Sequence, residues 1–254
     1  MMKQVIIERE KIYRGNLLLV NASYPLKNTE KERKKGLVPA CVYFPAILLK
    51  RDAANILQMV LEKISPGSLI VPVSGYRTQK EQEDIYNGSL RDNGEEFTKK
   101  YVALPRHSEH QTGLAIDLGL YKEKIDFIRP DFPYTGICNK FRKAASAYGF
   151  IERYQKDKED ITGISHEPWH FRYVGYPHSR IITDNNFSLE EYIEFIKNYT
   201  KNNKLMYKDK SGTITQIYYV PAEDQTVINL PDRCTSQVSG NNTDGFIVTV
   251  WGKI

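Results

Sequence analysis

Two short stretches of the chain hold histidines and carboxylates at spacings typical of metal ligands. The first runs from residue 107 to 118 with the sequence HSEHQTGLAIDL, and the second runs from 167 to 175 with the sequence EPWHFRYVG. In the first stretch, six residues separate His110 from Asp117, with Gly113 between them. The apolar run around Asp117 is typical of a strand. These two stretches constrain the fold most, because their side chains have to reach one common pocket.

The residue types in the two stretches match the needs of a catalytic zinc ion. Such an ion takes three protein ligands and keeps a further position for water. His110, Asp117 and His170 supply three ligands, and Glu167 is a carboxylate outside this set that can act as the general base. A single histidine is more often a packed or surface residue than a ligand, but the combination predicts a mononuclear zinc hydrolase.

Three motifs together resemble one known family of enzymes. They are Ser74-Gly-Tyr-Arg77, the pattern Ser108-x-His110-x-x-Gly113-x-Ala115-x-Asp117, and the pattern Glu167-x-Trp169-His170-x-Arg172-Tyr-Val-Gly175. This set is similar to the zinc D,D-carboxypeptidases and D,D-dipeptidases, a family that includes the VanX, VanY and VanXY enzymes of vancomycin resistance and bacterial L,D-carboxypeptidases. The resemblance covers roughly residues 70 to 180. It is strongest to the VanXY type, in a longer variant with an added C-terminal segment.

The resemblance implies roles for further residues and a substrate class. It implies that Arg77 stabilises the oxyanion or clamps the substrate carboxylate, and that zinc is the cofactor. The implied substrates are the D-Ala-D-Ala dipeptide and muramyl pentapeptides that end in it, which would make the enzyme a contributor to vancomycin resistance. The expected substrate contacts lie near the motifs or in the long connection between residues 121 and 137: Ser74, Tyr76, Gln82, Ser108, Asp126 and Asp131.

Composition and charge argue against several other classes of protein. The net charge is +5, from 36 basic and 31 acidic residues that are spread along the chain, and the one short basic cluster, Lys31 to Lys35, is expected to be a solvated loop. We therefore expect no nucleic-acid partner. The three cysteines are widely spaced, which favours free thiols in a reducing compartment. The first ten residues carry charges and no run is long enough to cross a membrane, so we expect a cytoplasmic protein without a membrane anchor.

The order of apolar patterns predicts an α+β fold, with a small antiparallel sheet that carries the zinc site, flanking helices and a C-terminal β-rich appendage. We expect a catalytic domain over residues 1–202 and a small β extension over 203–254. Helices are predicted at 45–64 with a stop at Ser65-Pro-Gly67, at 78–86 with a capping box from Thr78 to Glu81, at 95–103, at 139–148 and at 188–197. Strands are predicted as a hairpin over 5–20 and singly at 69–73, 114–118, 150–154, 167–175, 213–220, 227–230 and 246–251, with loops over 21–36 and 87–95.

Two other functions remain open on the sequence alone. One is a peptidoglycan L,D- or D,D-carboxypeptidase of cell-wall turnover, which is expected to carry an export signal or an anchor. The other is a catalytically silent zinc-binding module. The presence of Glu167 and Arg77 argues against the silent module, because a structural zinc site needs neither a base nor an open coordination position.

Overall fold

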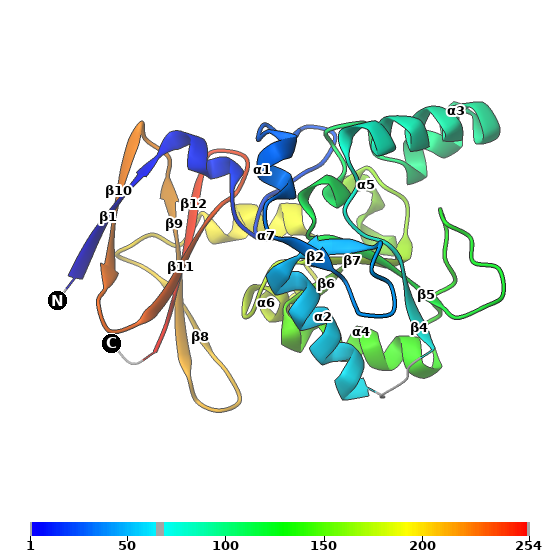
Figure 1. Cartoon of the computed structure of the whole chain (residues 1–254). Coiled ribbons are helices and arrows are strands. Elements are labelled where there is room, and N and C mark those ends of the chain that lie inside the picture. The colour runs from blue at the N-terminus through cyan, green and yellow to red at the C-terminus, as the bar shows by residue number, and fades with distance from the viewer. Residues whose placement is uncertain (1, 65–68, 253–254) are drawn as a thin grey trace. The chain divides into compact units, whose positions relative to one another are not determined.

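The computed structural model describes residues 2–64 and 69–252, and these form two compact units. One unit is Val20–Ser188, and the other combines residues 2–19 with residues 189–252. Figure 1 shows both units and labels their elements. The predicted domain boundary after residue 202 is a different division of the chain and stays a prediction.

A four-stranded antiparallel sheet forms the centre of the unit Val20–Ser188. Its strand order is β4-β5-β7-β6, and the strands are β4 (Ile70–Ser74), β5 (Ala115–Leu120), β7 (Glu167–Tyr173) and β6 (Phe150–Tyr154). The two central strands, β5 and β7, are the ones that carry the metal-ligand motifs. The α+β prediction with a small antiparallel sheet is confirmed.

Side chains alternate in direction along the central strands, which gives the sheet one apolar face and one polar face. Successive side chains of a strand point to opposite faces. Ile116, Leu118 and Phe171 belong to the apolar core, whereas Asp117 and His170 occupy the intervening positions. The buried positions of these strands therefore form two sets: apolar side chains that pack in the core, and polar side chains on the opposite face that can bind or react.

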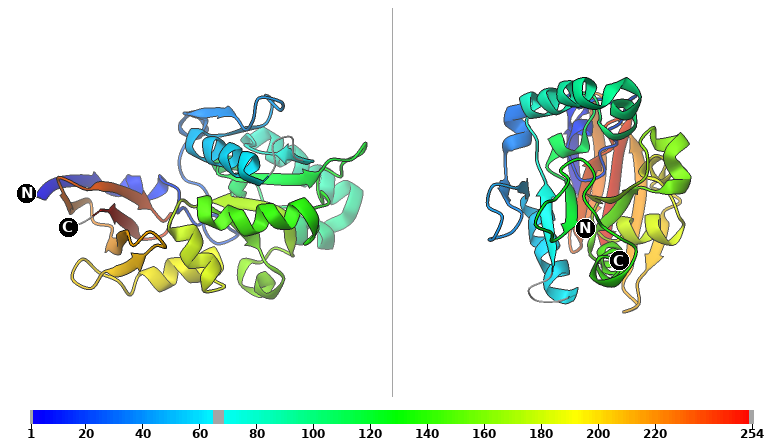
Figure 2. Two further views of the ribbon diagram at one scale, coloured as in Figure 1. Left: turned by 90° about the horizontal axis from the view of Figure 1, so that it is seen from below. Right: turned by 90° about the vertical axis from the view of Figure 1, so that its right-hand side faces the viewer.

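Two helices, α2 (Arg51–Ile64) and α4 (Gly136–Tyr148), cover the apolar face of this sheet. In α2 the residues Ala53, Ala54, Leu57 and Val60 are buried at spacings of three or four, which gives the helix one apolar stripe. The two helices also contact each other, and Figure 2 gives two further views of the ribbon. This packing makes the strands a rigid support for the polar face.

The remaining helices, strands and turns of this unit lie outside the four-stranded sheet. They are α1 (Glu30–Lys34), β2 (Leu37–Pro39), β3 (Leu48–Lys50), α3 (Gln79–Tyr101), α5 (Glu159–Thr162), α6 (His178–Asp184) and the short 3-10 turns η2 (Glu109–Thr112) and η3 (Lys156–Lys158). The predicted capping box at the start of α3 is confirmed, since the Thr78 hydroxyl accepts from Glu81 N–H and the Glu81 carboxylate accepts from Thr78 N–H.

The other unit is mainly β structure. It contains β1 (Met2–Glu8), η1 (Arg9–Tyr13), α7 (Leu189–Ile196), β8 (Leu205–Lys208), β9 (Ile214–Pro221), β10 (Gln225–Pro231), β11 (Thr235–Gly240) and β12 (Gly245–Trp251). One sheet has the order β11-β12-β9-β8, and β1 pairs with β10 in a second sheet. Its apolar core is built from Ile12, Tyr218, Ile228, Leu230, Phe246, Val248 and Val250.

Several predicted elements near the N-terminus were wrong because long-range pairing overrides the local pattern. The predicted hairpin over residues 5–20 does not form, since β1 pairs instead with β10 more than two hundred residues away. The predicted loop over residues 21–36 contains α1, in which Arg33 is buried although it was expected to be solvated. The helix predicted from residue 45 begins at Arg51, because Leu48–Lys50 pairs as a strand with Leu37–Pro39.

Other boundaries also differ from prediction. Residues 87–93, predicted as a loop, are helical, and α3 is interrupted only at Gly94, whose φ of 82° and ψ of 174° are not helical. Helix α6 was not predicted, and α4 begins three residues earlier than predicted. The described part of the C-terminal segment, residues 203–252, holds five strands where about three were expected. The predicted stop at Ser65-Pro-Gly67 lies outside the described residues.

Candidate metal centre and active site

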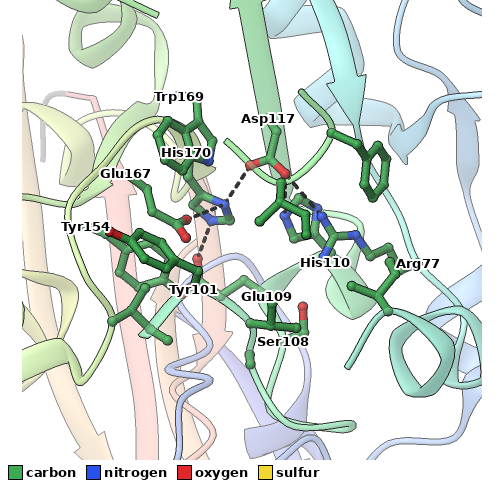
Figure 3. Close-up of a pocket in the computed structure, with 16 residues that line it drawn as sticks. Arg77, Tyr101, Ser108, Glu109, His110, Asp117, Tyr154, Glu167, Trp169 and His170 are labelled. Carbon is green, nitrogen blue, oxygen red and sulfur yellow. Dashed lines mark hydrogen bonds and ion pairs between the residues drawn. The ribbon is translucent and has the colours of Figure 1, made fainter. Parts of the chain in front are cut away.

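Three buried side chains from three different elements converge on one point of the polar face. His110 comes from η2, Asp117 from β5 and His170 from β7, and one ligand atom of each lies within 4.8 Å of the others. Figure 3 shows these side chains around the pocket. The predicted ligand set is therefore brought together by the fold.

The convergence follows from sheet register and one turn. Asp117 is the direct cross-strand partner of His170, so both side chains lie on the same face of the sheet. His110 reaches them because the chain turns at Gly113, which has a φ of 74°. A side chain at Gly113 would be strained at this φ, and its Cβ would lie 2.8 Å from Leu37 Cδ2.

Hydrogen bonds orient both imidazole rings. His110 Nδ1 lies 2.7 Å from the carbonyl oxygen of Gly75, so it donates there and leaves Nε2 facing Asp117 Oδ2 at 3.1 Å. His170 has the opposite arrangement: Nε2 lies 3.4 Å from Glu109 Oε2, and Nδ1 lies 2.9 Å from Asp117 Oδ1. Each ring therefore turns one nitrogen toward Asp117 and holds the other on a protein oxygen, as histidines that bind metals commonly do.

The electrostatics of the centre favour a positive charge between these groups. Burial by itself lowers the pKa of His170, but hydrogen bonds to Asp117 and Glu109 outweigh it and raise this pKa to about 9. Burial and the positive Arg77 lower the pKa of His110 to about 4. The neighbouring imidazoles outweigh burial at Asp117 and hold its pKa well below the usual range. Two imidazole nitrogens, a carboxylate and a demand for positive charge together fit a divalent cation.

Glu167 lies beside this centre without joining the ligand set. Its Oε2 is 3.8 Å from His170 Nδ1, and burial raises its pKa to about 8. In a regular strand, residues three apart point to opposite faces. The register between β6 and β7 shifts here, with Tyr154 opposite Glu167 but Glu152 opposite Phe171, so β7 holds two extra residues. This bulge allows the Glu167 carboxylate to reach the same pocket as His170.

Arg77 is held at the edge of the centre by three acceptors. Its Nε donates to Ser74 Oγ at 3.0 Å, its Nη1 to Gln82 Oε1 at 3.4 Å and its Nη2 to Asp117 Oδ2 at 3.1 Å. The capping box that starts α3 immediately follows Arg77 and fixes the backbone there. The guanidinium is thus held in one orientation next to the candidate metal ligands.

A pocket opens over these groups, and its walls come from both strands and loops. It is lined by Arg77, Ile85, Tyr101, Val102, Ala103, Ser108, Glu109, His110, Asp117, Phe127, Ile128, Tyr154, Ile164, Glu167, Trp169 and His170. The predicted substrate contact Ser108 is among them, and so are two residues of the long connection after β5. This connection therefore reaches the pocket through Phe127 and Ile128.

Other predicted substrate contacts lie away from the pocket lining. Ser74 and Gln82 hold Arg77, and Gln82 also donates to Ala103 O at 2.8 Å. Asp126 accepts from the N–H groups of Ile128 and Arg129, both at 2.9 Å, and Asp131 pairs with Lys122. Tyr76 is half-buried, and it too is absent from the lining. Direct substrate contacts by these residues stay predictions.

Sequence reasoning gave no role to Glu109, Arg153 or Arg172, although these side chains are fully buried. Glu109 Oε1 accepts from Arg153 Nε at 2.9 Å and from Arg172 Nη1 at 2.7 Å. The available signal was weak: each arginine interrupts an apolar strand, at the alternate position that faces away from the core. The same signal occurs in strands with one solvated face, so only the structure identifies the ion cluster.

Comparisons with known proteins identify relatives of this chain. The family model of VanY, D-alanyl-D-alanine carboxypeptidase, matches residues 46–176. The bifunctional D-Ala-D-Ala dipeptidase and D-Ala-D-Ala carboxypeptidase VanXYC of Enterococcus gallinarum is 43% identical over 183 residues, which are 72% of this chain and 95% of that protein.

Two solved structures extend the comparison. The vancomycin-resistance D,D-dipeptidase VanXYg, in complex with a D-Ala-D-Ala phosphinate analogue, superposes with a TM-score of 0.96 at 63% identity and covers 99% of this chain and 100% of that one. A mutant of the D,D-pentapeptidase VanY from a VanB-type resistance cassette, in complex with Zn(II), gives a TM-score of 0.56 at 26% identity over 70% of this chain and 98% of that one.

Proposed function

The chain belongs to the VanY family of D-alanyl-D-alanine carboxypeptidases, and from this premise we propose that it is a zinc-dependent D,D-peptidase. Its substrates are D-Ala-D-Ala and peptidoglycan pentapeptide precursors that end in it, so its activity supports resistance to vancomycin. The observation that carries the proposal is the convergence of His110, Asp117 and His170 with a non-ligand carboxylate, Glu167, 3.8 Å from His170.

Zinc is the metal that the donor set fits best. His110 Nε2, the Asp117 carboxylate and His170 Nδ1 would hold it, since two imidazoles and one carboxylate are a common ligand set of catalytic zinc. A zinc-bound relative in the same family supports the assignment. These residues would place the ion where it could supply Lewis acidity, polarising the scissile carbonyl and lowering the pKa of a water molecule.

Glu167 moves the proton. As a carboxylate, it takes a proton from the attacking water and then donates it to the nitrogen of the departing D-alanine, so the peptide C–N bond breaks without a free amide anion. Burial raises the pKa of Glu167 to about 8, which makes the carboxylate a stronger base than an exposed glutamate. Its pKa is then close to neutral pH, where a group can both take and return a proton.

Arg77 and Ser108 bind the substrate. The guanidinium of Arg77 is aimed at the pocket and stabilises the negative charge that develops on the carbonyl oxygen. Ser108 lines the same pocket two residues before His110 and binds the terminal carboxylate of the substrate. The connection after β5 contacts the amino-terminal side of the substrate through Phe127 and Ile128.

The thiols support a proposal for the cellular setting. Cys41, Cys138 and Cys234 are free, as is usual in a reducing compartment. Among the described residues, no helix is both long and apolar enough to cross a bilayer. We place the enzyme in the cytoplasm, on the strength of the free thiols.

The decisive experiment compares zinc-loaded wild type with Glu167→Gln on three substrates. These are D-Ala-D-Ala, a muramyl pentapeptide ending in it, and a tetrapeptide whose last bond joins an L- to a D-residue. We expect wild type to cleave the first two, and kcat for Glu167→Gln to fall on the order of 10²–10⁴-fold while one zinc stays bound. The control is Glu95→Gln, an exposed position on α3, which should retain full activity.

Each other outcome has a definite meaning. Cleavage of the tetrapeptide alone would reassign the enzyme as an L,D-carboxypeptidase. Wild type that binds zinc but cleaves none of the three would indicate a silent zinc module. Loss of zinc from Glu167→Gln would make Glu167 a ligand and overturn its assignment as the base.

A further inference from the structure

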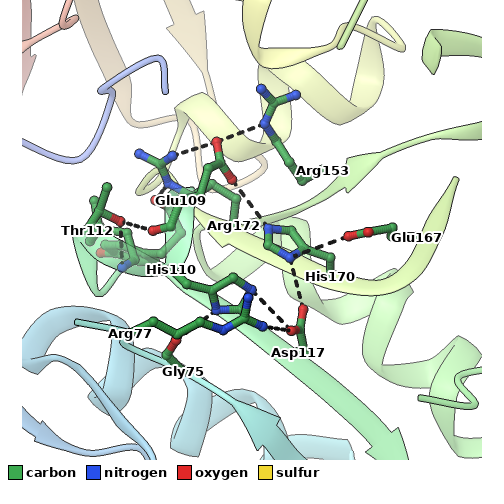
Figure 4. A network of polar contacts seen from close by, with 12 residues as sticks. Gly75, Arg77, Glu109, His110, Thr112, Asp117, Arg153, Glu167, His170 and Arg172 are labelled. Atoms are coloured by element: carbon green, nitrogen blue, oxygen red, sulfur yellow. Dashed lines mark hydrogen bonds and ion pairs between the residues drawn. The ribbon is translucent and has the colours of Figure 1, made fainter. Parts of the chain in front are cut away.

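Glu109 is a buried carboxylate whose two oxygens face different partners. Oε1 accepts from Arg153 and Arg172, and Oε2 lies 3.4 Å from Nε2 of His170. The side chains of Glu109, Arg153 and Arg172 have no exposed surface. Figure 4 shows this network, with Glu109 between the two guanidinium groups and the imidazole.

The position of Glu109 links both histidines of the metal centre. It directly precedes His110 on η2, and its carboxylate reaches β6 through Arg153 and β7 through Arg172 and His170. A carboxylate so deep in the protein is costly to bury without partners of opposite charge, and the two arginines provide them. They also fix the rotation of the carboxylate, which leaves Oε2 facing the imidazole.

This contact determines which nitrogen of His170 is available. An ionised carboxylate is an acceptor only, so the nitrogen that faces it has to carry a hydrogen. His170 Nε2 therefore carries a hydrogen. Nδ1, which lies 2.9 Å from Asp117 Oδ1 on the side of the centre, would turn its lone pair to a metal ion bound between it and that carboxylate. The opposite tautomer would place a hydrogen on Nδ1, where a metal ligand needs a lone pair.

We propose that Glu109, held by Arg153 and Arg172, is a positioning residue that sets the tautomer and orientation of His170 for metal binding. The inference rests on the proposed zinc site. It adds an outer layer of buried charge on the side of His170 opposite to Asp117. Glu109 acts through His170, so the primary effect of its replacement is on the affinity for zinc.

An isosteric replacement separates this role from a purely structural one. In Glu109→Gln, the two arginine donors still require an oxygen, so the amide oxygen turns to them and the NH2 group faces His170 Nε2. An NH2 donor favours a lone pair on Nε2 and a hydrogen on Nδ1, which is the wrong tautomer for the metal. A side chain that merely filled space and paired with arginines would tolerate glutamine with little effect on zinc.

The experiment measures the zinc dissociation constant of wild type and Glu109→Gln by competition with a chelator at fixed pH. We expect the constant to rise about 10- to 100-fold, as is usual when the partner of a ligating histidine is lost. Nitrogen-15 NMR of zinc-loaded wild type should show an Nε2–H on His170, and this signal should weaken or disappear in the variant. The matched control is Glu152→Gln, since Glu152 on β6 also pairs with an arginine, Arg142.

The outcomes decide between the two roles. A zinc affinity of Glu109→Gln within about twofold of the control would overturn the proposal. If glutamine prevents folding, Glu109→Asp replaces it: the charge that faces the arginines remains, but the carboxylate is drawn away from His170, and at least a tenfold loss of zinc affinity is expected. No loss there would also contradict the proposal. Zinc affinity is read without substrate, so absence of D,D-peptidase turnover in wild type would refute only the proposed function.

Discussion

At the scale of single residues, the geometry of Arg77 matters as much as its charge. Its three nitrogens donate to three different acceptors, Ser74, Gln82 and Asp117, at 3.0, 3.4 and 3.1 Å. A guanidinium presents its N–H groups as a rigid fork, whereas a lysine is a point charge on a flexible stem. Arg77 is therefore held in one orientation, as its proposed role in binding the substrate requires.

Arg77→Lys should keep the charge but lose this fixed orientation. We expect kcat/KM for D-Ala-D-Ala to fall about 10²- to 10³-fold, the usual cost of removing a donor that stabilises an oxyanion. Steady-state kinetics of the zinc-loaded variant measures this, with the exposed Arg91→Lys on α3 as control. Activity within threefold of wild type would show that the charge alone suffices.

At the scale of elements, α3 illustrates how one backbone position shapes the pocket rim. The helix runs from Gln79 to Tyr101 but is interrupted at Gly94, and its last residue, Tyr101, lines the pocket. Thr98 donates to the carbonyl oxygen of Gly94 at 2.8 Å and also contacts Ser89 at 2.8 Å. The interruption thus folds the second part of α3 back onto the first.

Two glycines of α3 should respond to alanine in opposite directions. Gly94→Ala is expected to lower the free energy of unfolding by roughly 1–3 kcal/mol, because φ of 82° with ψ of 174° is almost restricted to glycine. Apart from its chain neighbours, no atom of the described residues lies within 4 Å of the added Cβ, so the cost is backbone strain. Gly88→Ala, at a half-buried helical position where the added Cβ would lie 3.8 Å from Arg91 Nη2, should raise stability by roughly 0.5–1 kcal/mol. Urea unfolding of both variants tests this, and equal effects would contradict it.

At the scale of the whole molecule, stability also depends on groups outside the pocket lining. His178, in α6, is 1% exposed, and burial lowers its pKa to about 3. In the unfolded chain the same imidazole has a pKa of about 6.5. Between about pH 3 and 6.5, His178 is therefore neutral in the folded state and protonated in the unfolded state.

The sign of the resulting pH dependence is definite. Above pH 6.5 the imidazole is neutral in both states and contributes nothing to the dependence. As pH falls from about 6.5 toward 3, the unfolded state binds one more proton, so the free energy of unfolding falls by up to about 1.4 kcal/mol per pH unit. We expect His178→Gln to remove this slope. Urea unfolding between pH 7 and 5, with zinc removed from both proteins, measures the difference, and parallel curves would contradict the assignment.

The unit Val20–Ser188 and the β-rich unit also differ in which parts of the sequence they combine. The four-stranded sheet of the first unit is made from strands between residues 70 and 173, whereas the second unit needs both ends of the chain, since β1 pairs with β10. The N-terminal strand was predicted within the catalytic domain. Its pairing partner is far away in sequence, so no local pattern could reveal it.

The amino-acid sequence by itself determined which residues form the candidate site of this protein and which fold class holds them. The spacing of His110 and Asp117, the Glu167–His170 pair, the capping box at Thr78 and the α+β fold class could all be predicted, because each depends on residues close together or on a local apolar period. The β-rich character of the C-terminal segment followed from the same kind of pattern. Assignments of this kind need no knowledge of which distant segments meet.

Only the tertiary structure decided how these groups are held. The bulge that brings Glu167 beside His170 depends on strand register. The contact of Arg77 with Asp117 and the burial of Glu109 between two arginines depend on contacts across 40 or more residues. The nitrogen that each histidine turns to the centre depends on such contacts as well. The physical reason is that a buried charge or an imidazole tautomer is set by its three-dimensional neighbours, which local sequence patterns do not specify.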